Sequence, residues 1–410
     1  MAIMLQILSA ICFLVLVLLS LISFYQWAHA ILAILHRISP AVTLKPRTTR
    51  FLILIPAHNE EDGLPETLHS LFSMQYPKDL FQIVVIADRC ADETAKVART
   101  GGARCLERNE GPGGKGAAMS WAMQVLRKEG VLFDALVIVD ADCLADPHLL
   151  EAFDDALAKG HEVQQGYNYL SNPWETPFTR VIAVTSVLRN FLFYGGKEAI
   201  GCSAMLSGTG MCLSRSVVDQ HGWSAFSVAE DWEFSVSLQL HDVVIHFNPL
   251  ARVFARESKG LKQASRQRLR WATGKYAVMT NGARRLFLEG VSKGKVNLID
   301  GAVTLAAPNY SSQASMTLFA IVCSFVLAQD PAWSFLLPWS LGVLASLAGY
   351  FLLGAMYTQS PLKTLAGIPY IAVFLPWRLS IEILGMLGFG RKGWGRTFRD
   401  TASRRNTPGT

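Results

Sequence analysis

Charged side chains are scarce in this 410-residue sequence, of which only 17% is Asp, Glu, Lys or Arg while 51% is hydrophobic. A soluble domain carries about 25% charged residues, so the shortage excludes an ordinary soluble protein. The deficit is greatest at the N-terminus, where residues 1–35 contain no Asp, Glu, Lys or Arg. The sequence therefore predicts membrane segments at both ends and one globular domain of ordinary to large size between them.

Cysteine motifs are also missing. The seven cysteines include no C-x-x-C pair and show no paired spacing. They indicate neither a zinc site nor a disulfide framework, and we expect free thiols in a reducing compartment. Internal repeats and low-complexity segments are absent too, which leaves periodicity, charge placement and short motifs as the informative features.

The first apolar segment is long enough to cross a membrane, because residues 7–24 alone approach the ~20 residues that a spanning helix needs. A signal peptide is the alternative, since Ala28-His29-Ala30 resembles a cleavage site. No positive charge precedes the run, however, and basic residues follow it at Arg37, Lys45, Arg47 and Arg50. We therefore expect an uncleaved anchor over residues 1–40, with the N-terminus outside and the next domain in the cytoplasm.

The C-terminal part is apolar again. Residues 313–327 and 333–356 are candidate spans, whereas the next apolar segment, 362–389, is interrupted at Pro369, Pro376, Arg378 and Glu382. The tail at residues 390–410 is basic, which favours the cytoplasmic side. With the central domain in the cytoplasm, a cytoplasmic tail requires an even number of later crossings, and we expect two. The chain would then be a multi-pass membrane protein whose third C-terminal segment lies along the membrane surface.

The positive charge of the chain has a membrane explanation. The net charge is +6, and the basic residues gather beside the apolar ends. Charge in that position favours contact with membrane lipids and argues against nucleic acid as a partner.

Strand and helix patterns alternate through the central region. Apolar runs at 51–55, 82–87 and 136–139 predict buried strands, and amphipathic segments at 63–74 and 117–126 predict helices between them. Alternation at this spacing is typical of an α/β fold, a mostly parallel sheet with helices on both faces. The expected domains after the N-terminal anchor are an α/β domain at 51–272, interfacial linker helices at 273–312, a membrane region at 313–389 and the tail.

Two carboxylates follow the strand expected at residues 136–139. Asp140 and Asp142 stand one residue apart at the carboxyl end of that strand, where open α/β sheets bind ligands. Carboxylates this close repel each other unless a cation lies between them, and Mg²⁺ prefers oxygen ligands and bridges to phosphates. The pair predicts a metal–diphosphate site, although a solvated acidic turn would have the same sequence.

The loop from Gly111 to Gly116 supports a competing interpretation. It matches G-x-G-x-x-G and precedes a helix, with Asp140 at a suitable distance beyond it, as in dinucleotide-binding enzymes. The chain would then be a membrane-tethered NAD-dependent oxidoreductase. Against this, residues 107–110 separate the loop from its strand, the unit is not the first of the domain, and Lys115 suits a diphosphate better than NAD.

Two further segments place charged or aromatic residues on expected helices. Glu230 and Asp231 begin one helix, where the helix dipole alone explains an acid. Residues 263–271 form a basic helix that ends with Trp271, a pattern that an interfacial helix also has. Taken singly, neither segment identifies a function.

Six motifs in order nevertheless resemble one family. They are Pro56-Ala57-His58-Asn59-Glu60, the strand end at Asp88, Gly114-Lys115-Gly116, Asp140-Ala141-Asp142, Glu230-Asp231 and Gln267-Arg268-Leu269-Arg270-Trp271. Together they resemble a membrane-bound family 2 glycosyltransferase, and Q-x-x-R-W resembles its cellulose, chitin and hyaluronan synthase-like branch. The similarity covers residues 51–271. It departs at Ala229, where many relatives have Thr, and the small membrane part is atypical of enzymes that conduct a long polymer.

The resemblance implies a GT-A fold, which is Rossmann-like with a mostly parallel sheet. It also implies a nucleoside-diphosphate sugar as donor, expected to be a UDP-sugar, a divalent metal ion (Mg²⁺ or Mn²⁺), and inversion at the anomeric carbon. The acceptor would be a glycan or a lipid-linked sugar at the cytoplasmic membrane face. Surface polysaccharide or glycolipid synthesis is the expected setting.

The same resemblance implies roles for individual residues. Asp142, with Asp140, would hold the metal ion, and Asp231 would be the general base with Glu230 supporting it. The implied donor-binding residues are Pro56, Ala57, Glu60, Asp88, Lys115, Asp140, Gln267 and Arg270. The implied acceptor-binding residues are Trp271, Gly208 and Thr209.

Overall fold

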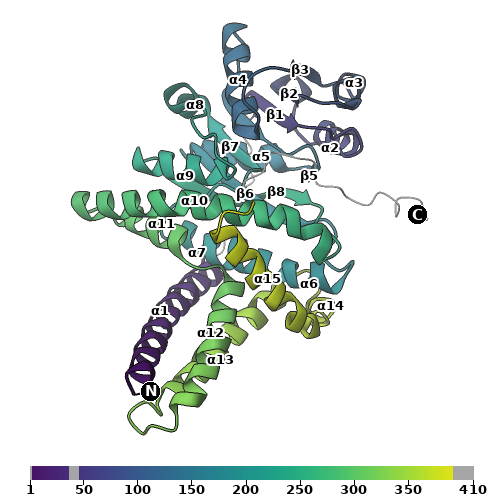
Figure 1. The fold of residues 1–410 in the computed structure, drawn as a ribbon. Coiled ribbons are helices and arrows are strands. Elements are labelled where there is room, and N and C mark those ends of the chain that lie inside the picture. The colour runs from purple at the N-terminus through teal and green to yellow at the C-terminus, as the bar shows by residue number, and fades with distance from the viewer. Residues whose placement is uncertain (1, 37–45, 391–410) are drawn as a thin grey trace.

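The computed structural model describes residues 2–36 and 46–390. Figure 1 shows a sheet domain with its helices at the top and a group of long helices below it, among them α1 (Ala2–Leu35) and α13 (Leu336–Met356). Several basic residues that carry the expected topology lie outside the described residues. They are Arg37, Lys45 and the tail arginines and lysine, Arg391, Lys392, Arg396, Arg399, Arg404 and Arg405.

One sheet forms the centre of the domain. Its strands are β1 (Phe51–Ala57), β2 (Phe81–Asp88), β3 (Arg104–Arg108), β4 (Ala135–Ile138), β5 (Cys143–Ala145), β6 (Val163–Leu170), β7 (Met211–Ser214) and β8 (Ile245–Ala255). Their order across the sheet is β3-β2-β1-β4-β7-β6-β8-β5. The first four strands in this order are mutually parallel, as are β6 and β8. The pairs β4–β7, β6–β7 and β5–β8 are antiparallel. The predicted mostly parallel α/β fold is thus confirmed.

Helices cover both faces of the sheet. They are α2 (Leu64–Phe72), η1 (Lys78–Leu80), α3 (Thr94–Thr100), α4 (Lys115–Lys128), α5 (Leu149–Leu157), α6 (Pro177–Val187), α7 (Gly195–Ala199), α8 (Arg215–His221) and α9 (Glu230–Leu240). Phe51, Ile53 and Ile55 of β1 pack in a core with α2, α3 and α5. Leu52 and Leu54 pack on the opposite face with α4 and α9. Because β1 is buried along its whole length, its sequence is continuously apolar.

The second half of the sheet contains two short strands that the sequence does not predict. These are β5 and β7, strands of three and four residues, which carry too little periodicity to detect. Between β6 and β7, a π-helical segment, Leu188–Tyr194, lies between α6 and α7. α7 packs against α1.

The basic helix at the end of the domain continues into the segment expected to hold linker helices. α10 covers Leu261–Lys293, 33 residues, and so includes both the helix expected over residues 263–271 and the start of the linker helices expected at 273–312. It ends at Gly294, whose φ of 64° is the left-handed conformation that terminates many helices. Because α10 packs along α11 (Val296–Ala306) and α15 (Ile371–Met386), it connects the sheet domain to the C-terminal helices.

Three apolar helices form a bundle below the domain. α1, α12 (Tyr310–Leu327) and α13 share a core that includes Leu16, Ala320 and Leu347. Within the described residues, four helical segments are long and apolar enough to cross a membrane: Ile3–Leu35, Tyr310–Leu327, Leu336–Met356 and Pro361–Met386. The apolar segments expected at both ends of the chain are therefore present as helices.

The last of these segments is interrupted. It consists of α14 (Pro361–Leu365), the 3-10 turn η3 (Ile368–Tyr370) and α15, and Figure 1 shows α15 beneath α10. Arg378 and Glu382 of α15 form an ion pair at 2.5 Å. Glu382 also accepts hydrogen bonds from Tyr276 of α10 at 3.0 Å and from Asn309 at 2.8 Å. Charged side chains thus join α15 to the base of the domain.

A buried ion pair joins α7 to α11. The side chain of Lys197 has no exposed surface, and its Nζ lies 2.7 Å from Oδ2 of Asp300. Tyr25 of α1 donates a hydrogen bond to Asp300, and Thr304 accepts one from Lys197 at 2.6 Å. Burial lowers the pKa of Lys197, while the charge of Asp300 opposes that shift. Each charge therefore depends on its partner for compensation.

Replacement of Lys197 by methionine should lower the free energy of unfolding by about 3–5 kcal/mol, because Asp300 would remain buried without a counter-charge. Thermal unfolding of the full-length protein in detergent would show this as a lower Tm. The matched control is Lys293→Met, which removes an exposed pair with Glu289 and should leave Tm nearly unchanged. Equal Tm values for the two variants would contradict a stabilising role for the buried pair.

Candidate active site

The carboxyl ends of the parallel strands gather predicted site residues at one edge of the sheet. β1 ends at Ala57, β2 ends at Asp88, and Asp140 follows β4 by two residues. Parallel strands present these ends at the same edge, which is where α/β sheets bind ligands. α4 begins at this edge with Lys115, and the first residue of α9, Glu230, lies 3.9 Å from the Lys115 ammonium group. Motifs far apart in the chain thus converge.

Lys115 lies where the predicted motifs meet. Its Nζ is 2.5 Å from Oδ1 of Asp140 and 2.6 Å from the carbonyl oxygen of Gly208. Burial alone would lower the pKa of Lys115, but three neighbouring carboxylates outweigh burial and raise it. The ammonium group is therefore charged at physiological pH and suited to an anionic ligand.

Glu230 and Asp231 form the first turn of α9. Burial raises the pKa of Glu230 to about 7 and that of Asp231 to about 6, against the opposing charge of Lys115. Oδ1 of Asp231 accepts the backbone N–H of Trp232 at 2.9 Å. A carboxyl group with a raised pKa is suited to proton transfer near neutral pH.

Gly208 lies directly beside this carboxylate. A Cβ atom at Gly208 would be 3.5 Å from Oδ2 of Asp231 and 3.4 Å from Nζ of Lys115. The φ of Gly208 is 82°, a conformation that glycine adopts without strain. The backbone can therefore approach both charged groups closely at this point.

Asp140 and Asp142 can hold a metal ion. One ligand atom from each of these residues and from Cys143 lies within 4.8 Å of the others. The backbone N–H of Asp140 donates to Oγ1 of Thr209 at 3.0 Å, which fixes the start of the acidic segment. Carboxylate oxygens suit Mg²⁺ and Mn²⁺, whereas a buried thiol suits softer ions. The two aspartates therefore fit a divalent ion of the oxygen-preferring kind.

Asp88 lies at the same edge, but two arginines engage it. Its Oδ1 is 2.5 Å from Arg108 and its Oδ2 is 3.0 Å from Arg89, and the side chain is fully buried. The sequence analysis does not identify either arginine. Any group that binds Asp88 must therefore share it with two guanidinium ions. The other predicted donor-binding residues near this edge are Pro56, Ala57 and Glu60.

Arg270 interacts electrostatically with the carboxylates of the site. Burial lowers the pKa of Arg270, and the charges of Glu230 and Asp140 oppose that shift. The guanidinium group therefore lies close enough to both Glu230 and Asp140 to be stabilised by their charges. Gln267 lies on the same helix less than one turn earlier and is half-buried.

Trp271 is the exposed part of the same motif. The indole is 45% exposed, and the guanidinium carbon of Arg268 lies 5.3 Å from its ring centroid. Arg268 also forms an ion pair with Glu257 at 2.5 Å. Arg268 therefore contacts both Glu257 and one face of the Trp271 ring, and the rest of the indole is exposed at the surface.

The sequence analysis misses a buried glutamine that holds the turn around Gly208 and Thr209. Nε2 of Gln165, on β6, donates to the carbonyl oxygen of Thr209 at 3.0 Å, and its Oε1 accepts the N–H of Ser207 at 2.8 Å. The feature of the sequence that could have identified it is the Gln164-Gln165 pair, two polar residues in the buried first half of a strand. Buried polar side chains are usually hydrogen-bonded, and here the partners are the backbone groups of the turn.

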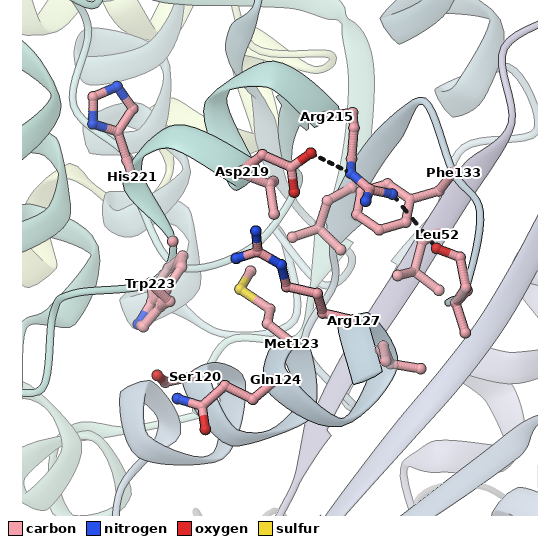
Figure 2. Close-up of a pocket in the computed structure, with 15 residues that line it drawn as sticks. Leu52, Ser120, Met123, Gln124, Arg127, Phe133, Arg215, Asp219, His221 and Trp223 are labelled. Atoms are coloured by element: carbon pink, nitrogen blue, oxygen red, sulfur yellow. Dashed lines mark hydrogen bonds and ion pairs between the residues drawn. The ribbon is translucent and has the colours of Figure 1, made fainter. Parts of the chain in front are cut away.

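A cavity of about 300 Å³ lies elsewhere in the domain, between α4 and α8. Figure 2 shows Arg127, Met123 and Gln124 of α4 facing this space together with Trp223, and the ion pair of Arg215 with Asp219 beside it. No predicted site residue is among those that line it. The cavity is therefore separate from the carboxylate site.

Comparisons with known proteins identify glycosyltransferases among the relatives of this chain. The curated relatives include the Bacillus subtilis protein named probable glycosyltransferase YdaM, which is 26% identical over 245 residues, 57% of either chain. Beta-monoglucosyldiacylglycerol synthase of Trichormus variabilis is 25% identical over 55% of this chain and 48% of its own length. Poly-beta-1,6-N-acetyl-D-glucosamine synthase of Staphylococcus aureus is 26% identical over 55% of this chain and 54% of its own. The chain thus spans about half the length of the curated relatives it matches.

A solved structure has the same fold. It is the mannosyltransferase PcManGT from Pyrobaculum calidifontis in complex with GDP-Man and Mn²⁺, with a TM-score of 0.54 and 16% identity over 93% of this chain and 98% of that chain. The oxidoreductase interpretation of the loop from Gly111 to Gly116 finds no support among these proteins. The family profile described as glycosyltransferase like family 2 matches residues 46–274, more than half of the chain, and the protein belongs to that family.

Proposed function

We propose that the protein is an inverting glycosyltransferase of the Q-x-x-R-W branch, which moves a sugar from a nucleoside-diphosphate sugar to a glycan or lipid-linked acceptor. The observation that carries the proposal is the position of Lys115, bonded to Asp140 and to the carbonyl oxygen of Gly208 and 3.9 Å from Glu230. A cation, the candidate metal ligands and the carboxylate pair that contains the candidate base thereby share one site. Transfer from a diphosphate leaving group is favoured by cations beside the leaving group and by a base beside the acceptor hydroxyl.

On the donor side, the leaving diphosphate develops negative charge. Lys115 and Arg270 would bind its oxygens, the arginine through the planar fork that matches phosphate. Asp140 and Asp142 would hold a divalent metal ion, which when bound supplies further stabilisation of the leaving group. Mg²⁺ and Mn²⁺ both suit these ligands.

On the acceptor side, Asp231 would take the proton of the attacking hydroxyl. The acceptor oxygen bonds to the anomeric carbon as the bond from that carbon to the diphosphate oxygen breaks, and the hydroxyl proton moves to Asp231. Attack opposite the leaving group inverts the anomeric configuration. Burial raises the pKa of both Asp231 and Glu230, so this pair of carboxyl groups is suited to accept a proton near neutral pH.

The nucleotide would bind along the ends of β1 and β2. Carboxylates accept hydrogen bonds from ribose hydroxyls and from ring N–H groups, which is the role proposed for Glu60 and for Asp88 with its two arginines. Pro56, Ala57 and Gln267 complete the proposed donor site. We propose a UDP-sugar as the donor.

The acceptor would approach from the side of the membrane helices. Trp271 offers an exposed aromatic face on which a sugar ring can pack, and Gly208 and Thr209 would line the path to Asp231. In this proposal residues 51–272 are the catalytic domain, 273–312 are interfacial linkers and 313–389 are the membrane region. The proposed products are surface glycans or glycolipids made at the cytoplasmic face.

Arg270→Lys should reduce turnover by about 10²-fold while the protein still inserts into membranes, because lysine keeps the charge but not the bidentate grip on a diphosphate. Release of nucleoside diphosphate by purified protein measures the effect. The matched control is Arg266→Lys, one turn earlier on α10, where the side chain is exposed. Full activity in Arg270→Lys would mean that Arg270 contacts only lipid headgroups.

The proposed topology has residues 51–300 in the cytoplasm and Met1 and Thr410 on opposite sides of the membrane. It takes α1, α12 and α13 as the crossings and places α15 at the membrane surface, because a crossing would bury the Arg378–Glu382 pair in lipid. Single cysteines introduced at each end and labelled from either side of the membrane test this. A tail labelled from outside would contradict two C-terminal crossings and require three.

The proposed activity is tested by screening full-length purified protein against a panel of nucleotide sugars with Mn²⁺ or Mg²⁺. We expect release of one nucleoside diphosphate, dependent on metal ion, on acceptor lipid and on Asp142. Binding of NADH without release from any nucleotide sugar would favour the oxidoreductase instead. Counting sugars added per acceptor at limiting acceptor separates a single transfer from polymer synthesis.

A further inference from the structure

Two histidines and a glutamate from separate elements meet where α7 joins the sheet. His161 follows α5, Glu198 lies on α7 and His246 lies on β8. Oε1 of Glu198 is 3.0 Å from Nδ1 of His246 and 3.9 Å from Nδ1 of His161, and one ligand atom of each residue lies within 4.8 Å of the others. All three side chains are partly exposed, so ions from solvent can reach them.

The carboxylate of Glu198 has a fixed orientation. Its Oε2 accepts the backbone N–H of Phe247 at 2.8 Å, which leaves Oε1 directed at the two imidazoles. Metal ligands in proteins are commonly held by such a second contact, which sets the direction of the ligating atom. The strand that carries His246 thus also positions the carboxylate beside it.

The two imidazole rings are stacked, with centroids 3.7 Å apart and planes inclined by 8°. Neutral imidazole is the form that binds metal ions. Because parallel rings cannot both direct a lone pair at one ion, binding requires one ring to turn about its Cβ–Cγ bond, which the partial exposure of His161 permits.

We propose that His161, Glu198 and His246 bind a divalent transition-metal ion, Zn²⁺ by the chemistry of the ligands, at a site separate from Asp140 and Asp142. Two imidazoles and one carboxylate are an established ligand set for Zn²⁺, with water in the fourth position. Nitrogen ligands bind Zn²⁺ more tightly than Mn²⁺, whereas the aspartates suit oxygen-preferring ions. The two sites therefore select different metals.

The ion would fix the position of α7. Glu198 directly follows Lys197, whose pair with Asp300 joins α7 to α11. Beyond α7 the chain continues to the turn at Gly208, whose carbonyl oxygen contacts Lys115. Zn²⁺ at this junction stabilises the fold around the turn and takes no part in the chemical step.

The test uses the full-length protein in detergent, purified without a histidine tag and stripped of metal by a chelator. Zn²⁺ is titrated by calorimetry in excess Mg²⁺, which occupies the aspartates, and Tm is recorded with and without Zn²⁺. We expect the wild type to bind one equivalent of Zn²⁺ and to unfold at a higher Tm when Zn²⁺ is present. His161→Ala and His246→Ala should bind Zn²⁺ at least ~100-fold more weakly, and Zn²⁺ should not raise their Tm.

The matched control is His148→Ala. His148 pairs with Glu151 at 2.6 Å, but the described residues place no third ligand beside them, so this variant should bind Zn²⁺ like the wild type. Cooperative unfolding of each metal-free variant shows that weaker binding is not a failure to fold. The proposal is overturned if the wild type binds no Zn²⁺ in excess Mg²⁺, or if His161→Ala binds it as tightly as His148→Ala.

Discussion

Asp231→Asn should lower turnover by about 10²–10⁴-fold while donor and metal ion bind almost normally. Asparagine has nearly the same shape as aspartate but cannot take the proton of the acceptor hydroxyl. The metal-binding carboxylates are untouched, and Lys115 keeps its bonds to Asp140 and Gly208. Metal-dependent binding of nucleoside diphosphate and turnover, measured on the same preparation, separate the two effects.

The pH profile gives a second check on the same residue. Burial raises the pKa of Asp231 to about 6, so the base becomes protonated, and turnover falls, as the pH drops through that value. The fall in turnover at low pH should be absent from the residual activity of Asp231→Asn. The control Asp219→Asn alters a carboxylate that pairs with Arg215 on the surface and should behave as wild type. Near-normal turnover in Asp231→Asn would mean that Asp231 only begins a helix.

Asp142→Asn should weaken metal-dependent donor binding by more than ~10-fold, because it replaces a charged ligand of a hard cation with a neutral amide. Turnover should fall as well, and raising the metal concentration should restore part of it, which it cannot do for Asp231→Asn. Titration of nucleoside diphosphate at several Mn²⁺ concentrations measures both quantities.

The matched control for this variant is Asp146→Asn in the same segment. Asp146 accepts the backbone N–H of His148 at 2.9 Å and has no proposed role in metal binding. It should keep normal donor affinity. If Asp142→Asn bound donor and turned over like Asp146→Asn, the aspartate metal site would be wrong and the glycosyltransferase proposal would lose its main chemical support.

The strands whose ends form the site could be predicted from the sequence, because a strand that is buried on both faces is continuously apolar. Residues 51–55 and 136–139 are continuously apolar, and polar residues appear only where each strand leaves the sheet. Parallel strands then place these ends at one edge of the sheet, so it follows from the fold class that Asp88 and Asp140 lie at the same edge. Lys115 was identifiable because a lysine in a glycine-rich loop before a helix suits phosphate.

The ion-pair partners of the site residues could not be predicted from the sequence. The arginines that engage Asp88 come from the residue after it and from the end of β3, and sequence spacing says nothing of which side chain turns inward. The sequence analysis separates the helix that holds Arg270 from the linker helices expected at 273–312, whereas α10 is continuous from Leu261 to Lys293. Packing against α11 and α15 stabilises this long helix, and such tertiary contacts cannot be read from the sequence.

The central claim is that one displacement, assisted by Asp231, moves a sugar from a nucleoside diphosphate to an acceptor. The measurement that tests it most directly is the anomeric configuration of the first product, read by NMR during turnover of a nucleotide sugar with an α-linked sugar. The proposal predicts a β-linked product from the wild type and essentially none from Asp231→Asn. An α-linked product, formed with retention, would contradict a single displacement and the role given to Asp231.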